Sequence, residues 1–216
     1  MQKVFQAVGK ACLSCKVSIN TTQIQVKMAK VYEFLADGFE DIEALLPVDV
    51  LRRGGVEVVT VSVSGAEIVT SAHGVGVKAD CLFEQVGSFE DADLLLLPGG
   101  MPGAKHLNAH QGVRDALLKQ FNSGRKVGAI CAAPMVLGSL GVLKGRQATC
   151  YPGFEQYLEG AEYTADKVTA DGNLTTGNGP GAAPKYAFTL LAQLTSPEKA
   201  AQVKAEMQFV CGCHKA

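Results

Sequence analysis

One cysteine follows directly on a short apolar segment and precedes a run of small residues, in Lys126-Val-Gly-Ala-Ile-Cys-Ala-Ala-Pro134. An apolar strand that runs into Cys131 and then into a helix predicts a nucleophile elbow, the sharp turn that lifts one side chain above the carboxyl edge of a parallel sheet. A helix N-terminus favours thiolate, so we expect the pKa of Cys131 to fall below the usual value of about 8.5. The alternative is an inert core cysteine at the end of a strand.

Two glycines, Gly99 and Gly100, follow a second apolar segment at residues 93–97. Glycines at this place let backbone N–H groups turn toward a ligand. We expect the N–H of Gly100 and that of Ala132 to form an oxyanion hole beside Cys131, with Gly99 as an auxiliary residue. An ordinary glycine turn is the alternative.

Two glutamates lie in the acidic segment that follows the first apolar run, Asp37-Gly-Phe-Glu-Asp-Ile-Glu43. Glu40 and Glu43 are three residues apart and share one face of a helix. We expect Glu43 to point at Cys131 as an acid, because burial and a nearby thiolate both favour a protonated carboxyl. Glu40 would cap or brace the helix. The alternative is a pair of solvated acids in a first helical turn.

The elements that must position these groups alternate between strand and helix. This alternation predicts a single domain, residues 28–210, with a doubly wound, mostly parallel sheet in a three-layer α/β/α sandwich. The expected strands are 30–35, 56–63, 93–97 and 126–130, with short β segments within 66–80 and near 146–150, 167–170 and 173–176. The expected helices are 40–53, 113–123, 132–140 and 181–194, with a short one from Pro197.

Four segments together resemble the ThiJ/PfpI superfamily, and more narrowly the branch of the Parkinson-associated deglycase (DJ): residues 40–53, 97–104, 129–134 and 179–181. The resemblance covers nearly all of residues 28–205. It implies a flavodoxin-like fold and a homodimer. It also implies a reactive cysteine, a protonated glutamate touching it and two backbone N–H groups, which by motif are Cys131, Glu43, Gly100 and Ala132.

The sequence departs from related branches at two positions. Ala132 stands where protease-type relatives have a histidine, and Tyr151 stands where many relatives of the deglycase branch have one, so Tyr151 is an auxiliary candidate. A downstream His-x-Glu, as in the amidotransferase relatives, is absent. The chain's histidines do not adjoin the elbow: His73, His106, His110 and His214. A Cys–His nucleophile is therefore disfavoured.

The resemblance also assigns a partner surface. Asp49 and Arg53 fall in the helix that family dimers pack at their interface, so both are interface candidates. The alternative is a plain surface ion pair, worth about 0–1 kcal/mol.

The chemistry implied is the conversion of methylglyoxal, glyoxal or their early adducts on proteins and nucleotides to 2-hydroxy acids, without metal or organic cofactor. A cysteine thiolate of this kind is also open to oxidation. The alternative function is therefore a redox sensor or oxidation-triggered chaperone that acts through Cys131. Amidase or peptidase action is disfavoured, because no histidine adjoins the elbow.

Composition excludes several other classes of function. The 216 residues carry a net charge of −1 and no basic stripe, which argues against nucleic acid or an anionic membrane as a partner. No apolar run approaches the roughly 18 residues of a membrane helix. Seven cysteines in no regular framework favour a reducing, cytoplasmic location. Residues 1–27 contain four lysines and no acid, and we interpret them as an extension before the domain.

The remaining cysteines have less specific settings. Two pairs at opposite ends of the chain have metal-like spacings, Cys12/Cys15 and Cys211/Cys213, the second followed by His214. A joint zinc site is one interpretation. Incidental terminal cysteines are the preferred one, so we expect no metal site. Cys150 is interpreted as a core cysteine, with a secondary oxidation site as the alternative.

Overall fold

The centre of the fold consists of strands that are almost entirely apolar. In the computed structural model, which describes residues 28–209, β1 (Lys30–Leu35), β6 (Leu94–Leu97) and β7 (Lys126–Ile130) run side by side. Every residue of β6 is buried, and so is every residue of β1 and β7 after the first lysine. Continuous apolar strands of this kind are typical of parallel sheets covered on both faces.

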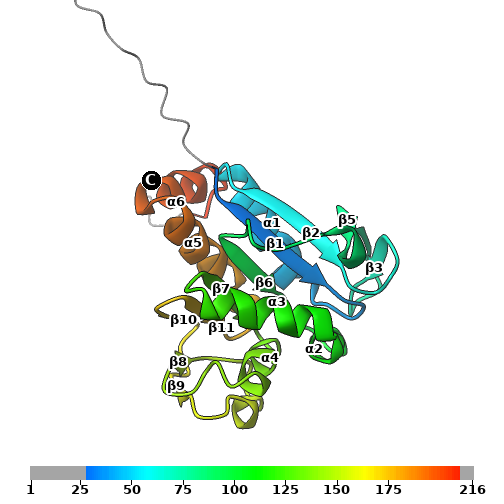
Figure 1. Cartoon of the computed structure of the whole chain (residues 1–216). Helices are drawn as coiled ribbons and strands as arrows, with labels where there is room; N and C mark the ends of the chain where they lie inside the picture. The colour runs from blue at the N-terminus through cyan, green and yellow to red at the C-terminus, as the bar shows by residue number, and fades with distance from the viewer. Residues whose placement is uncertain (1–27, 210–216) are drawn as a thin grey trace, which may run out of the picture.

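The main sheet has seven strands in the order β10-β11-β7-β6-β1-β2-β5 (Figure 1). All neighbouring pairs are parallel except β10 and β11, which confirms the predicted doubly wound, mostly parallel sheet. The outer strands are β2 (Glu57–Ser62), β5 (Cys81–Leu82), β10 (Val168–Asp171) and β11 (Leu174–Gly177). Two small sheets pair β3 (Ile68–Thr70) with β4 (Gly76–Lys78) and β8 (Gln147–Ala148) with β9 (Glu162–Tyr163).

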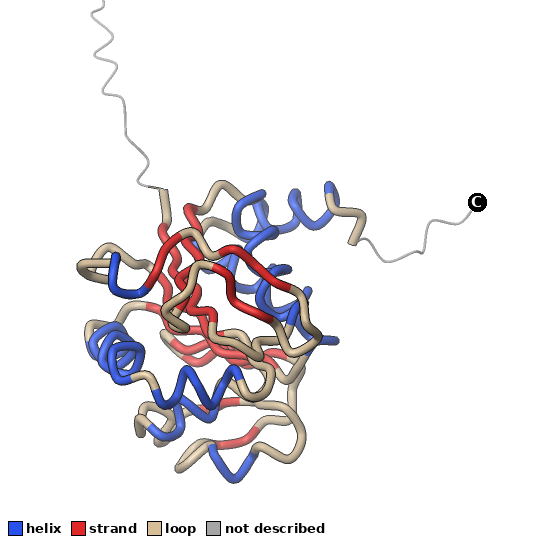
Figure 2. Tube along the Cα trace, turned by 90° about the vertical axis from the view of Figure 1, so that its right-hand side faces the viewer, coloured by secondary structure: helices blue, strands red, loops and turns tan. Residues whose placement is uncertain are grey.

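Helices cover both faces of this sheet, as Figures 1 and 2 show. On one face, α1 (Asp41–Arg53), α5 (Ala183–Leu194) and α6 (Pro197–Glu206) share a core with the inward side chains of β1, β6 and β7. On the other, α3 (Gln111–Asn122) and α4 (Pro134–Ser139) form a second core, with α2 (Gly103–Ala109) beside them. No helix within residues 28–209 is long and apolar enough to cross a membrane.

The helix boundaries differ from the sequence-based prediction in physically explicable ways. Helix α2 was not predicted, because it is a single short element with only three buried residues. Helix α3 begins two residues early because the side chain of His110 caps it and accepts a hydrogen bond from the N–H of Val113 at 3.2 Å. Helix α4 begins at Pro134 rather than Ala132, since the residues after β7 form a turn.

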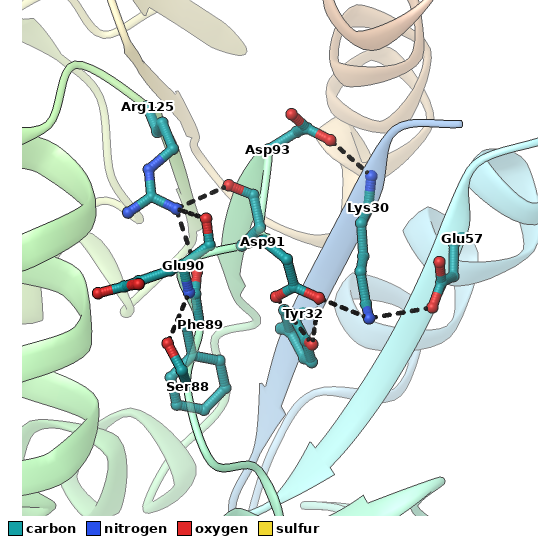
Figure 3. A network of polar contacts seen from close by, with 10 residues as sticks. Lys30, Tyr32, Glu57, Ser88, Phe89, Glu90, Asp91, Asp93 and Arg125 are labelled. Atoms are coloured by element: carbon teal, nitrogen blue, oxygen red, sulfur yellow. Dashed lines mark hydrogen bonds and ion pairs between the residues drawn. The ribbon is translucent and has the colours of Figure 1, made fainter. Parts of the chain in front are cut away.

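A network of polar contacts ties the strands together at their amino-terminal edge (Figure 3). The ammonium of Lys30 on β1 lies 2.8 Å from Asp91 and 3.2 Å from Glu57 on β2. The Lys30 backbone N–H also donates to Asp93 at 2.9 Å, and the hydroxyl of Tyr32 donates to Asp91 at 3.1 Å. These contacts fix the edge of the sheet opposite to the one where the predicted site residues lie.

Some predictions lie outside the described residues. These are the extension at residues 1–27 and the terminal cysteine pairs with their alternative zinc site, and they stay predictions. Within residues 28–209, the three cysteines are free thiols: Cys81, Cys131 and Cys150.

Candidate active site

Cys131 occupies a sharp turn between β7 and α4. Its φ angle is 62°, in the left-handed region that a non-glycine residue seldom adopts. The turn is held on both sides, because the Cys131 N–H donates to the carbonyl of Gly177 at 2.8 Å and its carbonyl accepts from the N–H of Tyr151 at 2.9 Å. The residue is 8% exposed. A strained, clamped conformation of this kind is typical of functional positions.

Glu43 reaches the same edge of the sheet from the first turn of α1. Its side chain is fully buried, and Oε2 accepts a hydrogen bond from the N–H of Gly99 at 3.1 Å. Burial raises the pKa of its carboxyl to about 7, while interaction with Cys131 opposes the rise and the charge of Glu40 adds to it. Glu43 is therefore a carboxyl that exchanges its proton near neutral pH.

Glu40 caps the helix that carries Glu43. Its Oε2 accepts from the Glu43 N–H at 2.8 Å, and its own N–H donates to the carbonyl of Gly99 at 2.9 Å. One residue thus satisfies a free donor at the start of α1 and fastens that start to the loop after β6. The sequence predicted this capping role.

The two glycines after β6 are required by close approach. A Cβ at Gly99 would lie 2.5 Å from Oε2 of Glu43 and 2.6 Å from the Cβ of Cys131. Gly100 has a φ of 88°, and a Cβ there would overlap the backbone of Gly38, Phe39 and Glu40. Glycine at position 99 lets the backbone pass between the acid and the cysteine, and glycine at position 100 lets it lie against the segment before α1.

The electrostatics of Cys131 correct one prediction. Burial raises the pKa of its thiol above the ordinary value, and the adjacent Glu43 raises it further through its charge and a hydrogen bond. The N–H groups of Gly100 and Ala132 donate to the sulfur and lower the pKa, but they do not offset burial. The expected fall in pKa was wrong in direction, because it counted the helix N-terminus and left out burial and the neighbouring carboxylate.

The two groups are best described as one titrating unit. They lie in contact, so one proton on either the sulfur or the carboxyl leaves a single negative charge on the pair. When Glu43 holds the proton, its charge no longer raises the pKa of Cys131, and a thiolate that forms there accepts hydrogen bonds from the N–H groups of Gly100 and Ala132. The arrangement can therefore supply a nucleophile, an acid and two amide donors at one point.

Comparison with known proteins shows the family of the chain. The model of the DJ-1/PfpI family matches residues 29–193, most of the chain. The chain belongs to the DJ-1/PfpI family.

Individual relatives within the DJ-1/PfpI family agree with this. Protein DJ-1 homolog B of Arabidopsis thaliana is 36% identical over 201 residues, which are 90% of this chain and 46% of that protein. The chain thus spans about half of that plant relative. A deglycase of Pyrococcus horikoshii is 35% identical over 153 residues, covering 70% of this chain and 90% of that enzyme. The structure of oxidized Toxoplasma gondii DJ-1 has a TM-score of 0.80 and 35% identity, covering 83% and 98% of the two chains.

Tyr151, the candidate in place of a family histidine, lies next to the elbow through its backbone bond to Cys131. Its side chain is 45% exposed, and its ring packs edge-on against Phe154 and lies beside Gly179. Cys150, one residue earlier, is fully buried, and burial raises the pKa of its thiol to about 12. This setting is that of a core cysteine.

The described histidines have partners elsewhere in this member of the DJ-1/PfpI family. His110 caps α3, and His106 lies 2.9 Å from the carbonyl oxygen of Asp37. His73 pairs with Asp41 at 2.6 Å, which raises the pKa of the imidazole. The sequence missed this pair because the two residues are far apart in the chain.

A metal-compatible cluster adjoins the start of α1. Ligand atoms of Glu40, Asp41 and His73 lie within 4.8 Å of one another, and this is the group of its kind found within residues 28–209. Glu40 already caps the helix and Asp41 already pairs with His73. We assign no ion to these residues.

The interface candidates lie together on the outer face of α1. Asp49 and Arg53 form an ion pair of 2.9 Å, and both side chains are about half exposed. Ile42 and Leu45 on the same helix are also exposed, although they are large and apolar. An exposed apolar strip next to a charge pair is a feature of protein–protein contact surfaces.

Proposed function

We propose that this chain is a cofactor-independent enzyme of the deglycase or glyoxalase III type, which converts methylglyoxal, glyoxal or their early adducts to 2-hydroxy acids. The observation that supports it best is the contact between Cys131 and the buried carboxyl of Glu43, whose pKa is raised to about 7. A relative named as a deglycase, 35% identical over 70% of this chain, supports the same class of reaction.

The chemistry follows from the placement of the groups. The thiolate of Cys131 attacks the aldehyde carbon, and the N–H groups of Gly100 and Ala132 stabilise the resulting alkoxide until Glu43 protonates it. Glu43, now ionised, removes the proton from that carbon and delivers it to the adjacent carbon, while the hydroxyl proton passes to the neighbouring carbonyl oxygen. This converts the hemithioacetal to a 2-hydroxy thioester. Water then hydrolyses the thioester, and the thiol and the 2-hydroxy acid are released.

The low exposure of Cys131 favours small substrates within this class. Only 8% of the residue is exposed, so a two- or three-carbon aldehyde reaches the sulfur more readily than an adduct on a folded protein. A cavity of about 1030 Å³ lies between α5 and α6, and neither Cys131 nor Glu43 lines it. We therefore place the reaction at the elbow and not in that cavity.

The proposal includes a homodimer formed through α1 and a cytoplasmic location. The exposed Ile42 and Leu45 beside the Asp49–Arg53 pair support the first. The free thiols among the described residues support the second, because reducing compartments keep cysteines unpaired.

A redox-sensing or chaperone role is the second candidate. A relative with a TM-score of 0.80 is described as an oxidized DJ-1. A protonated Glu43 next to Cys131 would also hold a sulfinate by a hydrogen bond. Amidase or peptidase action stays disfavoured, because the three described histidines have partners elsewhere.

The test is lactate release from methylglyoxal by reduced, folded protein. We expect saturable turnover by the wild type and none by Cys131→Ser or Glu43→Gln. Cys81→Ser is the matched control, because this thiol lies on the edge strand β5 and its loss should leave turnover unchanged. If the wild type releases no more lactate than Cys131→Ser, the aldehyde proposal fails. Oxidation of Cys131 by peroxide, followed by mass spectrometry, then becomes the test of the second candidate.

A further inference from the structure

Buried oxygens without partners concentrate on one face of the sheet. Both carboxyl oxygens of Glu33, the hydroxyl of Tyr186 and Oε1 of Glu43 are buried and lack a hydrogen-bond partner. Glu33 is 1% exposed, and the other two residues are fully buried. Buried polar groups in native proteins are almost always hydrogen-bonded, to protein or to internal water. Two carboxyls and one phenol that each have an oxygen without a partner, close to Cys131, therefore require an explanation.

The strand register places Glu33 and Tyr186 over the same row of the sheet. Glu33 on β1 pairs with Leu96 on β6, and Leu96 pairs with Gly128 on β7. Leu96 packs in the core beneath α1, α5 and α6, so the Glu33 side chain faces that core as well. The Tyr186 hydroxyl, from α5, would lie 2.6 Å from a Cβ at Gly128. The Tyr186 phenol thus lies against β7 at Gly128, and β6 separates that strand from Glu33 on β1.

The electrostatics link this row to the site. Burial is the largest cause that raises the pKa of the Tyr186 phenol, and a negative charge on Glu33 or on Glu43, where either carboxyl ionises, adds to it. Both carboxyls are therefore close enough to act on one hydroxyl. The charged groups that face the cluster are few: Arg52 acts on Glu33, and Glu40 and Cys131 act on Glu43.

Glu33 is a carboxyl whose surroundings favour the protonated form. Burial raises the pKa of its carboxyl well above the ordinary value, and Arg52 only partly opposes the rise. A neutral carboxyl has one O–H donor, and a phenol has one O–H donor and an acceptor oxygen. Glu43 has one oxygen already bonded to Gly99 and one free. When Glu43 is ionised its free oxygen can only accept, so the donors then run from Glu33 through Tyr186 to Glu43.

We propose that internal water links the three groups, so that neutral Glu33 donates toward the Tyr186 oxygen and the Tyr186 hydroxyl donates toward Oε1 of Glu43. Glu33 and Tyr186 are then positioning residues for the Cys131–Glu43 pair. Their donors stabilise the single negative charge that the pair carries and work against the effect of burial. The inference rests on the proposed function only in taking this pair as the reactive site.

The experiment measures the rate of Cys131 alkylation by iodoacetamide against pH, read by peptide mass spectrometry. Four variants are compared with the wild type: Tyr186→Phe, Glu33→Leu, Glu33→Gln and Tyr32→Phe. The last is the matched control, since Tyr32 adjoins Glu33 on β1 but packs on the opposite face and bonds to Asp91. The first two remove a donor, and Glu33→Gln keeps one in the same shape.

We expect the midpoint of alkylation to rise in Tyr186→Phe by on the order of one pH unit, the usual effect of one hydrogen bond to a charged group. Glu33→Leu should move it in the same direction by a smaller amount. Glu33→Gln and Tyr32→Phe should keep the wild-type midpoint.

Two results would overturn the proposal. The first is a pH midpoint of Cys131 alkylation that is the same in Tyr186→Phe, in Tyr32→Phe and in the wild type. It would show that no donor reaches Glu43 from Tyr186. A fall of the midpoint in Glu33→Gln would show that Glu33 is ionised in the wild type, because the variant would then have removed a like charge. If Glu33→Leu does not fold, Glu33→Gln and Tyr186→Phe still decide between these outcomes. The alkylation assay uses no aldehyde. A failure of the Glu33–Tyr186 proposal can therefore be distinguished from a failure of the protein to turn over methylglyoxal.

Discussion

The N–H of Gly99 donates a 3.1 Å hydrogen bond to Oε2 of Glu43 and leaves no space for a side chain between that acid and Cys131. The backbone after β6 thus sets the distance between the two groups that we propose to react. The same residue accepts from the N–H of Glu40 at the start of α1, so the loop, the acid and the helix cap form one unit.

Gly99→Ala should therefore impair turnover more than folding. The new methyl group would meet Glu43 Oε2 at 2.5 Å and the Cβ of Cys131 at 2.6 Å, so one of them must move. A displacement of about 1 Å at reacting groups costs on the order of 100-fold in rate. We expect kcat with methylglyoxal to fall by about that factor while the far-UV spectrum is kept. Gly87→Ala is the control, because a Cβ there meets nothing within 4 Å. Equal activity in the two variants would contradict the prediction.

The raised pKa of Glu43 predicts a pH dependence of stability. Burial raises the pKa from 4.5 to about 7 in the folded protein. Below pH 4.5 the carboxyl is protonated in both states, and above it the unfolded chain ionises first. Stability is therefore lost as the pH rises from 4.5 to about 7, by about 3 kcal/mol if the folded group titrates alone. Glu43→Gln should remove this loss.

Urea unfolding at several pH values checks this prediction. The free energy of unfolding of Glu43→Gln, relative to the wild type, should increase between pH 4.5 and 7 and then level off. Glu159→Gln replaces an exposed glutamate and should follow the wild type at every pH. A constant difference between Glu43→Gln and the wild type would mean that Glu43 has an ordinary pKa in the folded protein.

Much of the fold could be predicted because its signals are local. The continuous apolar runs at Leu94–Leu97 and Lys126–Ile130 each indicate a strand by composition alone, and both strands lie where expected. Helix α2 gave no comparable signal, because it is short and begins after Pro102. The start of α4 was misplaced because residues 131–133 form the turn of the elbow, with Cys131 in the left-handed region, and the helix begins only at Pro134.

In the candidate site, too, local motifs predict some features and contacts between distant elements determine the others. Cys131, Glu43 and Gly100 follow from motifs that end strands or begin helices. The direction of the Cys131 pKa does not, because it depends on burial and on a carboxylate from another element. The Glu33–Tyr186 relation was missed for a similar reason. Glu33 occupies a strand that reads as a core strand, and only the register across β1, β6 and β7 brings it near the end of Tyr186.

The cap of α1 offers a test that separates charge from hydrogen bonding. Glu40→Ala removes the acceptor of the Glu43 N–H and should lower the free energy of unfolding by about 1 kcal/mol. Glu40→Gln keeps an oxygen acceptor and should be nearly as stable as the wild type. Because the charge of Glu40 raises the pKa of Glu43, Glu40→Gln should also lower that pKa. Carboxyl titration by NMR checks the pKa, and an unchanged or raised pKa in Glu40→Gln would contradict the prediction.

The outer face of α1 predicts how two copies of the chain associate. Leu45 is exposed and apolar, lies near Ile42 and precedes the Asp49–Arg53 pair by about one helical turn. If this strip is the contact between two copies, a charge at its centre would be buried there without a partner. Leu45→Glu should therefore weaken the dimer by at least tenfold, or about 1.4 kcal/mol. The exposed Tyr163 on β9 supplies the control, Tyr163→Glu, which should associate as the wild type does. Sedimentation velocity over a concentration series measures both. If the wild type is monomeric at every concentration, the chain does not form this dimer. If Leu45→Glu associates as well as the wild type, the contact lies elsewhere on the surface.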